Sequence, residues 1–418
     1  MAKKRFTGRS EFYDKALSLG FYGNEESSLT GKKDNVRKFW EEISIKVYCR
    51  SLIEKHVVAG KKFSVLDLGS GTGEGYRLLT HIPPTNPKEA VDKEFLISPK
   101  DIKKYVGMES DRTLFDQAKL RYRDRVSHRF VHADPANELP NSVLENDPFD
   151  IYFSAFSSLS HLAPEQMEDL LTQILSHSKT GSVIFFEVFG KYSPEWPKYW
   201  SKDESMLPYT MGYLIPAEER KREDLERFLA SFWSPEALKS SIKNAEQRSG
   251  RKVKLTFMTD RSVFVGRHME TGLLSSKRVP IRFQVNRLFD HGYRGETKHL
   301  EINMGHLKHL KLSHPEVWSR LFQFQINWNR VIYILGALMN HKDTKIKKFI
   351  EDADKVEMSD DLKFLVWLFR NADRFPVADF WSSVLGPQVA VALRNIEMSY
   401  TEGLGCGHGL MCGLEVVK

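Results

Sequence analysis

A glycine-rich segment has the residue types and spacing of a ligand-binding turn. In Val65-Leu-Asp-Leu-Gly-Ser-Gly-Thr-Gly73, three glycines follow an apolar run that is typical of a central strand. Glycines let the backbone turn sharply and approach a ligand without a Cβ clash. Asp67 lies inside this strand, where it would repel a pyrophosphate but attract a ligand with sulfonium and ammonium groups. The residue three positions beyond Gly71 is Glu74, so a glycine of the dinucleotide pattern is missing. The segment therefore favours a cationic ligand over NAD.

Further polar residues end later strand-like runs. Glu109 follows one run, Asp134 follows the next, and Ser154-Ala-Phe156 follows a third. Taken singly, each acid also fits a turn cap or a solvated strand end. Because ligands of open α/β folds bind at the carboxyl ends of the strands, the acids together predict one site at that edge of a sheet.

The elements that must position these residues alternate along the chain. Strand-like apolar runs cover residues 63–68, 105–108, 129–132, 149–154 and 182–188. Helical patterns lie between them, most clearly from Pro164 to His177. This alternation predicts right-handed crossovers and a parallel sheet with helices on both faces. Residues 253–258 and 262–265 flank Thr259-Asp-Arg and predict an antiparallel hairpin.

The glycine-rich segment resembles motif I of the class I S-adenosylmethionine-dependent methyltransferases, and the later strand ends follow in the order of that superfamily. The resemblance covers roughly residues 60–190 and the hairpin near 253–268. It implies a Rossmann-like methyltransferase fold with a mainly parallel seven-stranded sheet. We expect an N-terminal helical cap at 1–60, the cofactor-binding domain at 61–275 with a lid and helix at 191–248, and a mostly helical C-terminal region at 276–418.

The resemblance also implies S-adenosylmethionine as cofactor, S-adenosylhomocysteine as product, and roles for single residues. Glu109 is expected to accept hydrogen bonds from both ribose hydroxyls, Asp134 to lie beside the adenine amino group, and residues 154–156 to lie under the reactive methyl. The expected cofactor-binding residues are Asp67, Gly69, Ser70, Gly71, Gly73, Glu109, Ser110, Asp134, Pro135, Ser154, Ala155 and Phe156, with Tyr13 and Arg37 from an N-terminal lid.

The acceptor side is less constrained, because methyl transfer mainly requires alignment and exclusion of water. The candidate catalytic residues are His161 as a base, Tyr209 and His268. Four aromatic residues either form an acceptor cage or simply pack a lid, and they are Trp196, Tyr199, Trp200 and Tyr213. Arg267 is a candidate for a two-pronged contact with a carboxylate or phosphate, or an ordinary surface arginine.

Several function classes remain open for the acceptor. The fourth strand-like run lacks the Asp/Asn-Pro-Pro-Tyr signature shared by methyltransferases that act on adenine or glutamine amino groups. Separate predicted caps at 10–40, 191–220 and 280–418 favour an enclosed small molecule. The formal charge of +7 permits RNA or protein as an alternative acceptor, although no RNA-binding module is recognised. A non-enzymatic scaffold that binds the cofactor is the third hypothesis.

Composition limits the cellular context. Three scattered cysteines do not make a disulfide framework, and no apolar run is long enough to span a membrane, so we expect a soluble cytoplasmic protein. Cys406-Gly-His-Gly-Leu-Met-Cys412 is too compact for a zinc ribbon or finger, and a glycine-rich turn before a last strand is the favoured interpretation, with no metal site. The C-terminal helical region is a candidate dimer interface.

Overall fold

The structure is a computed structural model that describes residues 11–18, 37–58, 60–86, 88, 91, 94–145, 147–211, 227–265, 281–339 and 359–417. The chain divides into two compact units, which are residues 1–261 with 401–418, and residues 262–400. The last residues belong to the first unit because they form a strand of its sheet, and the domain bounds expected from the sequence stay predictions.

A nine-stranded sheet organises the described part of the first unit. Its strands are β1 (Phe63–Leu68), β2 (Ile102–Glu109), β3 (His128–His132), β4 (Ile151–Phe153), β5 (Val183–Gly190), β6 (Met206–Tyr209), β7 (Phe228–Trp233), β8 (Val253–Arg261) and β9 (Gly409–Val416). The order is β3-β2-β1-β4-β5-β7-β6, and β9 pairs with β5 and β8. The predicted Rossmann-like, mainly parallel sheet is confirmed, with nine strands in place of the expected seven.

The predicted hairpin after residue 253 is wrong. Strand β8 runs without a turn from Val253 to Arg261 and pairs antiparallel with β9, so that Val253 faces Val416 and Arg261 faces Gly409. Strand β9 also pairs antiparallel with β5. The alternating residues of 253–265 indicate a strand but carry no information on a partner that lies almost 150 positions later. The predicted strand at the end of the chain is present.

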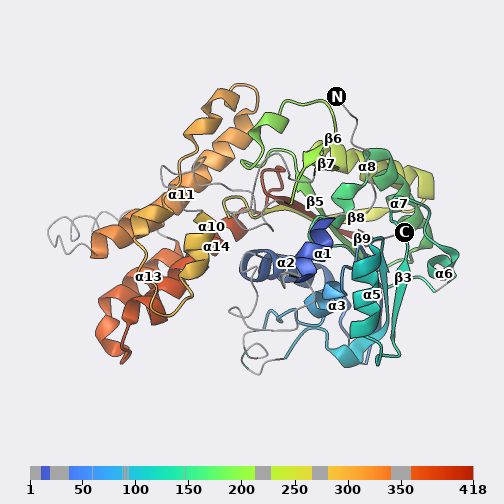
Figure 1. Ribbon diagram of the computed structural model, residues 1–418, viewed down its shortest axis with the longest axis horizontal. Coiled ribbons are helices and arrows are strands. Elements are labelled where there is room, and N and C mark those ends of the chain that lie inside the picture. The colour runs from blue at the N-terminus through green and yellow to red at the C-terminus, as the bar shows by residue number, and fades with distance from the viewer. Residues whose placement is uncertain are drawn as a thin grey trace. The chain divides into compact units, whose positions relative to one another are not determined.

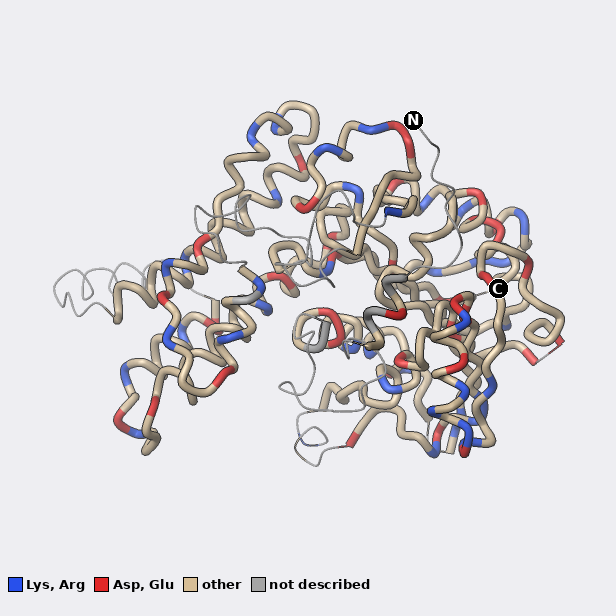
Figure 2. The backbone as a smooth tube through the Cα atoms, in the orientation of Figure 1, with Lys and Arg blue, Asp and Glu red and all other residues tan. Residues whose placement is uncertain are grey.

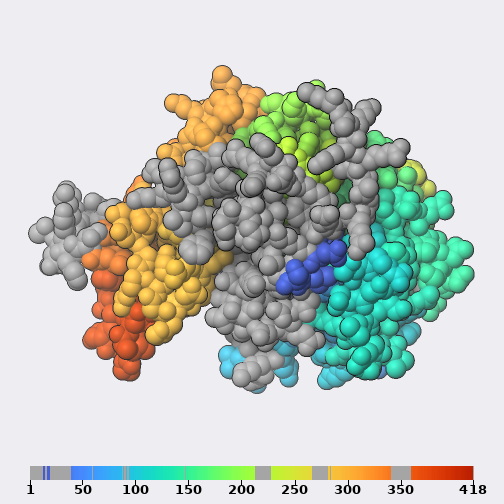
Figure 3. All heavy atoms as spheres, in the orientation of Figure 1, coloured from blue at the N-terminus to red at the C-terminus, as the bar shows by residue number. Residues whose placement is uncertain are grey.

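Helices cover both faces of the sheet (Figure 1). On one face lie α2 (Glu42–Ile53) and α3 (Glu74–Leu79), and on the other lie α7 (Pro164–His177) and α8 (Pro235–Ser249). Other helices among the described residues of this unit include α1 (Glu11–Ser18), the π-helix η1 (Arg37–Glu41), α5 (Arg112–Arg121) and α6 (Asn141–Leu144). Helix α1 lies beside α5 on the face seen in Figure 3.

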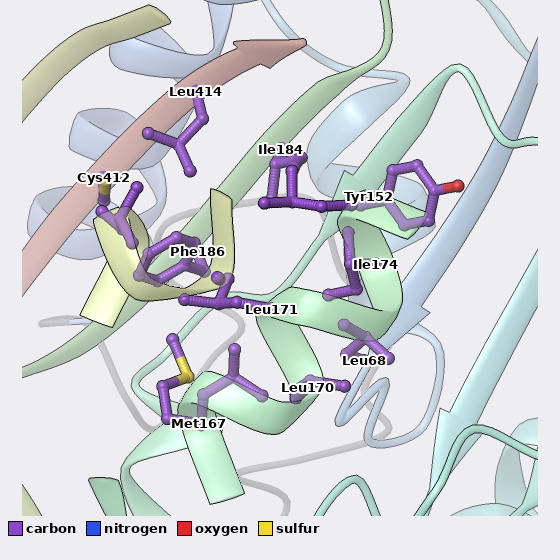
Figure 4. Packing of buried hydrophobic residues seen from close by; sticks show 14 of the residues in the cluster. Leu68, Tyr152, Met167, Leu170, Leu171, Ile174, Ile184, Phe186, Cys412 and Leu414 are labelled. Carbon is purple, nitrogen blue, oxygen red and sulfur yellow. The ribbon is translucent and has the colours of Figure 1, made fainter. Parts of the chain in front are cut away.

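The hydrophobic core between the sheet and α7 is formed by alternate residues of the strands and by residues of the helix that recur every three or four positions. Ile184 and Phe186 of β5 lie on the same side as Cys412 and Leu414 of β9, and all four pack with α7 (Figure 4). Their partners on α7 include Leu170, Leu171 and Ile174, which recur at helical spacing. Burial of each such side chain stabilises the fold by roughly 1.5–3 kcal/mol. This packing fixes β4 and β5, whose carboxyl ends border the site described below.

The second unit is helical in its described residues. Its main helices are α10 (Ile281–Arg287), α11 (Pro315–Met339), α13 (Asp360–Arg370) and α14 (Gly386–Met398). Trp328 and Asn329 of α11 hold the loop around Ile302 by hydrogen bonds to backbone atoms.

The charges of the described residues are mixed in sign. Figure 2 shows Lys and Arg interspersed with Asp and Glu along the chain of each unit. Within the described ranges, no helix is both long enough and apolar enough to cross a membrane.

Candidate active site

The glycine-rich segment forms a tight turn between β1 and α3. Gly69, Gly71 and Gly73 have φ values of +68°, +57° and +88°, which only glycine adopts readily. The N–H groups of Gly69 and Ser70 donate to the Met108 carbonyl at 2.9 and 3.0 Å, so the turn is tied to the end of β2. A Cβ on Gly69 would lie 2.6 Å from the Cβ of Ser158, which follows β4. The turn is thus wedged between the ends of two strands.

Glu109 at the end of β2 holds the same turn through its side chain. Its carboxylate accepts a hydrogen bond from the N–H of Gly71 at 2.7 Å and another from the N–H of Asp111 at 2.9 Å. Burial raises the pKa of Glu109, against the lowering effect of these two N–H groups. Since each carboxylate oxygen can accept more than one hydrogen bond, Glu109 retains capacity for hydroxyl donors of a ligand.

A second carboxylate lies where the turn meets helix α3. Glu74 accepts hydrogen bonds from the N–H of Thr72 at 2.9 Å and from its hydroxyl at 2.6 Å. In dinucleotide-binding folds the pyrophosphate lies at this helix N-terminus. Here a phosphate would meet the Glu74 carboxylate, so this turn disfavours an anion.

Asp67 faces the core beneath the turn. The Tyr105 hydroxyl donates a hydrogen bond to its carboxylate, and a Cβ on Gly75 would overlap that carboxylate. Only 2% of Asp67 is exposed, and burial raises its pKa to about 7. This position favours a structural role for Asp67 over the predicted direct contact with an ammonium group.

The segment after β4 closes the other side of the turn. The Ser154 hydroxyl donates to the Leu68 carbonyl at 2.8 Å, and the Ser158 hydroxyl donates to the Ala155 carbonyl at 2.9 Å. Phe156 and Ser157 have φ values of 57° and 58°. A left-handed backbone is unfavourable for a bulky residue such as Phe156, and such strain is concentrated at functional sites.

The other expected cofactor residues lie at the ends of β2 and β3. The Asp134 carboxylate accepts a hydrogen bond from the Ala136 N–H at 2.8 Å, forming the turn cap anticipated as its alternative role. Asp134 is nevertheless exposed, while the following Pro135 is buried. The His132 ring lies 3.0 Å from the carbonyl oxygen of Ser110 and joins the two strand ends. Apart from Asp67, whose side chain faces the core, the expected glycine, acid and serine positions therefore lie at the carboxyl edge of the sheet.

An aromatic cluster lies beyond the end of β5. We define it as Phe189, Trp196, Tyr199, Leu207, Tyr209, Met211, Ala230 and Phe232, with Tyr13 and Phe228 packed against it. The Trp196 indole donates to the Gly190 carbonyl at 2.8 Å, and the Tyr199 hydroxyl to the Pro208 carbonyl at 2.6 Å. Trp200 is buried outside this cluster, with its indole donating to the Ser193 carbonyl at 2.9 Å. These contacts favour the lid-packing interpretation of Trp196, Tyr199 and Trp200.

The structure brings together three residues that the sequence offered separately. The Tyr13 hydroxyl lies 3.5 Å from Nε2 of His161, whose ring stacks on Phe228 at 4.9 Å. Phe228 in turn packs against Tyr209. Desolvation by the surrounding protein lowers the pKa of His161, and the Asp134 carboxylate acts in the opposite direction. His161 therefore lies near the strand ends that carry the cofactor candidates.

Four predicted positions lack a described side chain. Tyr213, Arg267 and His268 lie outside the described residues, and of Arg37 only the backbone, at the start of η1, is described.

Sequence reasoning missed several buried polar residues at this edge. Glu187 lies in β5 and forms an ion pair with Arg261, and His408 lies 2.8 Å from the carboxylate of Glu195. The available signal for Glu187 was a single acid within the otherwise apolar run Val183-Ile-Phe-Phe-Glu-Val-Phe189. Arg261 was among the residues in or beside the predicted hairpin that the sequence offered for the acceptor pocket, and its ion pair with Glu187 could not be predicted.

The cysteine-containing segment near the C-terminus has a structural explanation. The Cys406 thiol donates to the Asp260 carboxylate at 3.3 Å, while Cys412 faces the core that α7 covers. Burial raises the pKa of the Cys412 thiol. In the described part of the chain, no three His, Cys, Asp or Glu residues are grouped as metal ligands.

No protein-family model and no curated protein matches the sequence. Solved structures with similar folds include an S-adenosylmethionine-dependent methyltransferase from Clostridium acetobutylicum, at 15% identity and a TM-score of 0.33 over 52% of this chain and 82% of that chain. The CcbJ methyltransferase from Streptomyces caelestis aligns at 13% identity and a TM-score of 0.36, over 59% of this chain and 89% of that chain. A DhpI-SAM-HEP complex aligns at 15% identity and a TM-score of 0.34, over 60% of this chain and 94% of that chain. At these identities and TM-scores, the likenesses assign neither a family nor a function to the chain.

Proposed function

We propose that this chain is an S-adenosylmethionine-dependent methyltransferase that acts on a small-molecule acceptor. The observation that carries the proposal is the pair of carboxylates that bracket the glycine turn. Glu109 binds the turn at Gly71, and Glu74 binds it at Thr72. Glu109 suits a cofactor with ribose hydroxyls to donate, whether or not it is a dinucleotide. Glu74, at the helix N-terminus, repels a pyrophosphate and favours a cofactor that is cationic at sulfur.

The residues present fit S-adenosylmethionine. Gly71 is partly exposed and has no side chain to hinder a ligand at its backbone, and Glu109 supplies acceptors for the two ribose hydroxyls. The Ser70 hydroxyl is buried in the turn and has no hydrogen-bond partner among the described residues, as expected of a group left for a ligand. In this proposal Asp134 borders the adenine, and residues 154–156 border the methionine portion.

Each catalytic task is assigned to this chain's own groups. S-adenosylmethionine, when bound, supplies an electrophilic methyl group that the acceptor takes by in-line displacement. His161 accepts a proton from the acceptor where the acceptor carries one, and desolvation, which lowers its pKa, favours the neutral imidazole that this role needs. The aromatic cluster excludes water beyond the end of β5.

The preference for a small acceptor rests on the N-terminal segment. Tyr13 of α1 packs against the aromatic cluster and lies 3.5 Å from His161. A segment that reaches the acceptor side of the site favours an enclosed ligand over an open groove. Methylation of RNA or protein, and binding without turnover, are the alternative outcomes of the following experiment.

Purified protein and S-adenosylmethionine carrying a labelled methyl group are incubated in three separate reactions, with a metabolite, an RNA or a protein fraction. We expect label in the metabolite fraction, with release of S-adenosylhomocysteine, and none with protein that carries Glu109→Ala. Label in RNA or protein alone would overturn the small-molecule assignment. Cofactor binding without transfer to any fraction would replace the enzyme by a scaffold.

A further inference from the structure

A buried network of three charged residues links distant parts of the first unit. Glu187 of β5 has no exposed surface, and its carboxylate forms an ion pair with Arg261, the last residue of β8. The Arg261 Nε donates to Glu187 Oε1 at 3.0 Å. The Nη1 of the same guanidinium lies 2.9 Å from the carboxylate of Glu41, in the π-helix that precedes α2. Arg261 therefore joins η1 to β5 in the middle of the sheet.

Two glycines leave room for the atoms of this network. A Cβ on Gly409 would overlap the Glu187 carboxylate, and a Cβ on Gly407 would lie 2.5 Å from the Arg261 carbonyl oxygen. Glycine is thus required at both positions of the Gly-His-Gly sequence near the C-terminus. Because desolvation offsets much of the attraction within a buried ion pair, stability alone is a weak reason for such an arrangement.

The Glu187 carboxylate also reaches the strained turn after β4. Its Oε2 accepts a hydrogen bond from the Phe156 N–H at 3.2 Å, and its Oε1 accepts one from the Ser157 hydroxyl at 3.0 Å. These are the two neighbouring non-glycine residues with left-handed φ values. A charge-assisted hydrogen bond is comparable in strength to the strain of one such residue, so the carboxylate is able to hold this backbone in place.

We propose that Glu187 is a positioning residue that fixes the Phe156–Ser157 turn. Arg261 and Glu41 hold the Glu187 carboxylate, so that docking of η1 against the sheet controls the geometry of the site. The inference rests on the proposed function, because it is the methyltransferase assignment that puts residues 154–156 beside the methionine portion of the cofactor. It extends that function by a contact network that couples η1 to the site.

The decisive variants exploit the freedom of glycine. Glu187→Gln keeps one acceptor oxygen but loses the charge that pairs with Arg261. Ser157→Gly removes the side chain from a residue at φ 58° and lets it adopt that backbone without a carboxylate to hold it. If Glu187 acts through this turn, Ser157→Gly restores function to the Glu187→Gln protein, whereas a residue that only stabilises the core is not rescued in this way.

The matched control is a carboxylate at the opposite edge of the sheet. Asp150 precedes β4, accepts a hydrogen bond from the Ser64 N–H at 2.9 Å, and pairs with Lys179 at 2.9 Å. Asp150→Asn therefore removes a charge and weakens a backbone contact without touching the turn. Glu41→Gln tests the link to the N-terminal segment through Arg261.

Two readouts separate this proposal from the proposed function. Without ligand, amide exchange of residues 154–158 should accelerate about 10-fold in Glu187→Gln, less in Glu41→Gln, and not in Asp150→Asn. By calorimetry, the affinity for S-adenosylmethionine should fall about 10-fold in Glu187→Gln. In the double variant that also carries Ser157→Gly, at least half of this loss, on a logarithmic scale, should be recovered. Unchanged exchange, or an affinity loss that Ser157→Gly does not reduce, would overturn the inference. Accelerated exchange in a protein whose wild type binds no S-adenosylmethionine would leave the coupling standing and remove the proposed function instead.

Discussion

The Tyr105 hydroxyl donates a hydrogen bond to the Asp67 carboxylate at the centre of the sheet, beneath the glycine turn. Both side chains are buried, and His128 and Tyr76 pack against the Tyr105 ring. In this largely apolar environment, the Asp67 carboxylate accepts its hydrogen bond from a neutral donor, the Tyr105 hydroxyl. The acid that marks the motif in the sequence thus supports the turn from below, while Glu109 and Glu74 contact it directly.

This burial makes stability depend on pH. Burial raises the pKa of Asp67 from its ordinary value of 3.8 to about 7, so between these values the folded state holds a proton that the unfolded state has released. Folding is therefore favoured below about pH 4, and that contribution is lost as the pH rises towards 7. We expect a loss on the order of 1–4 kcal/mol across this window, measured by urea unfolding.

Asp67→Asn provides the control for this effect, because it keeps the shape of the side chain and does not ionise. The difference in unfolding free energy between wild type and Asp67→Asn should shift with pH in the stated direction. Parallel pH profiles for the two proteins would show that Asp67 does not carry the effect.

Replacement of Glu109 should weaken cofactor binding more than folding. Glu109→Ala leaves the N–H groups of Gly71 and Asp111 without their carboxylate and removes the expected ribose acceptor. We expect the affinity for S-adenosylmethionine to fall roughly 10- to 100-fold, corresponding to about 1.4–2.8 kcal/mol, with a smaller effect for Glu109→Gln. Calorimetry on both variants and on Asp150→Asn measures this, and equal affinity in all three would contradict the site assignment.

The close approach of the two strand ends is testable with a pair of glycines. Gly69 has φ +68° and faces the Ser158 side chain, whereas Gly181 has φ +84° and no atom within 4 Å of an added Cβ. Gly181→Ala should cost only the left-handed strain, about 1–2 kcal/mol. Gly69→Ala should cost more and also weaken cofactor binding. Similar losses of stability for both, with affinity intact, would argue against a tight turn at Gly69.

A base at His161 predicts a particular pH profile. Desolvation lowers the pKa of His161 from its ordinary value of 6.5, so the acidic limb of kcat/KM should lie below that pH. With the acceptor found by methyl labelling, His161→Asn should slow transfer roughly 100- to 10,000-fold and abolish this limb. Retention of the limb in the variant would assign the titration to another group.

Sequence information was sufficient where the determinants are local. The apolar run before Gly69 and the glycines themselves specify a strand and a turn through their own backbone preferences, and alternating strands and helices specify a parallel sheet. For the same reason the acids at the strand ends could be placed at one edge before their geometry was known.

Long-range pairing and side-chain direction could not be obtained in this way. The partner of β8 is a strand near the C-terminus, and no local pattern in residues 253–261 distinguishes it from a neighbour across a short turn. Asp67 has the position expected in the motif, but only the packing of Tyr105 and Gly75 shows that its carboxylate faces the core. The Glu187 network joins residues from β5, β8 and η1, so it exists only in the folded chain.

Calorimetric titration of the purified protein with S-adenosylmethionine and S-adenosylhomocysteine, with NAD as a control, tests the central claim most directly. The arrangement of Glu74 and Glu109 around the glycine turn predicts saturable binding of the first two and none of NAD. Binding of NAD alone, or of none of the three, would contradict the assignment of this edge of the sheet to a methyl-donor cofactor.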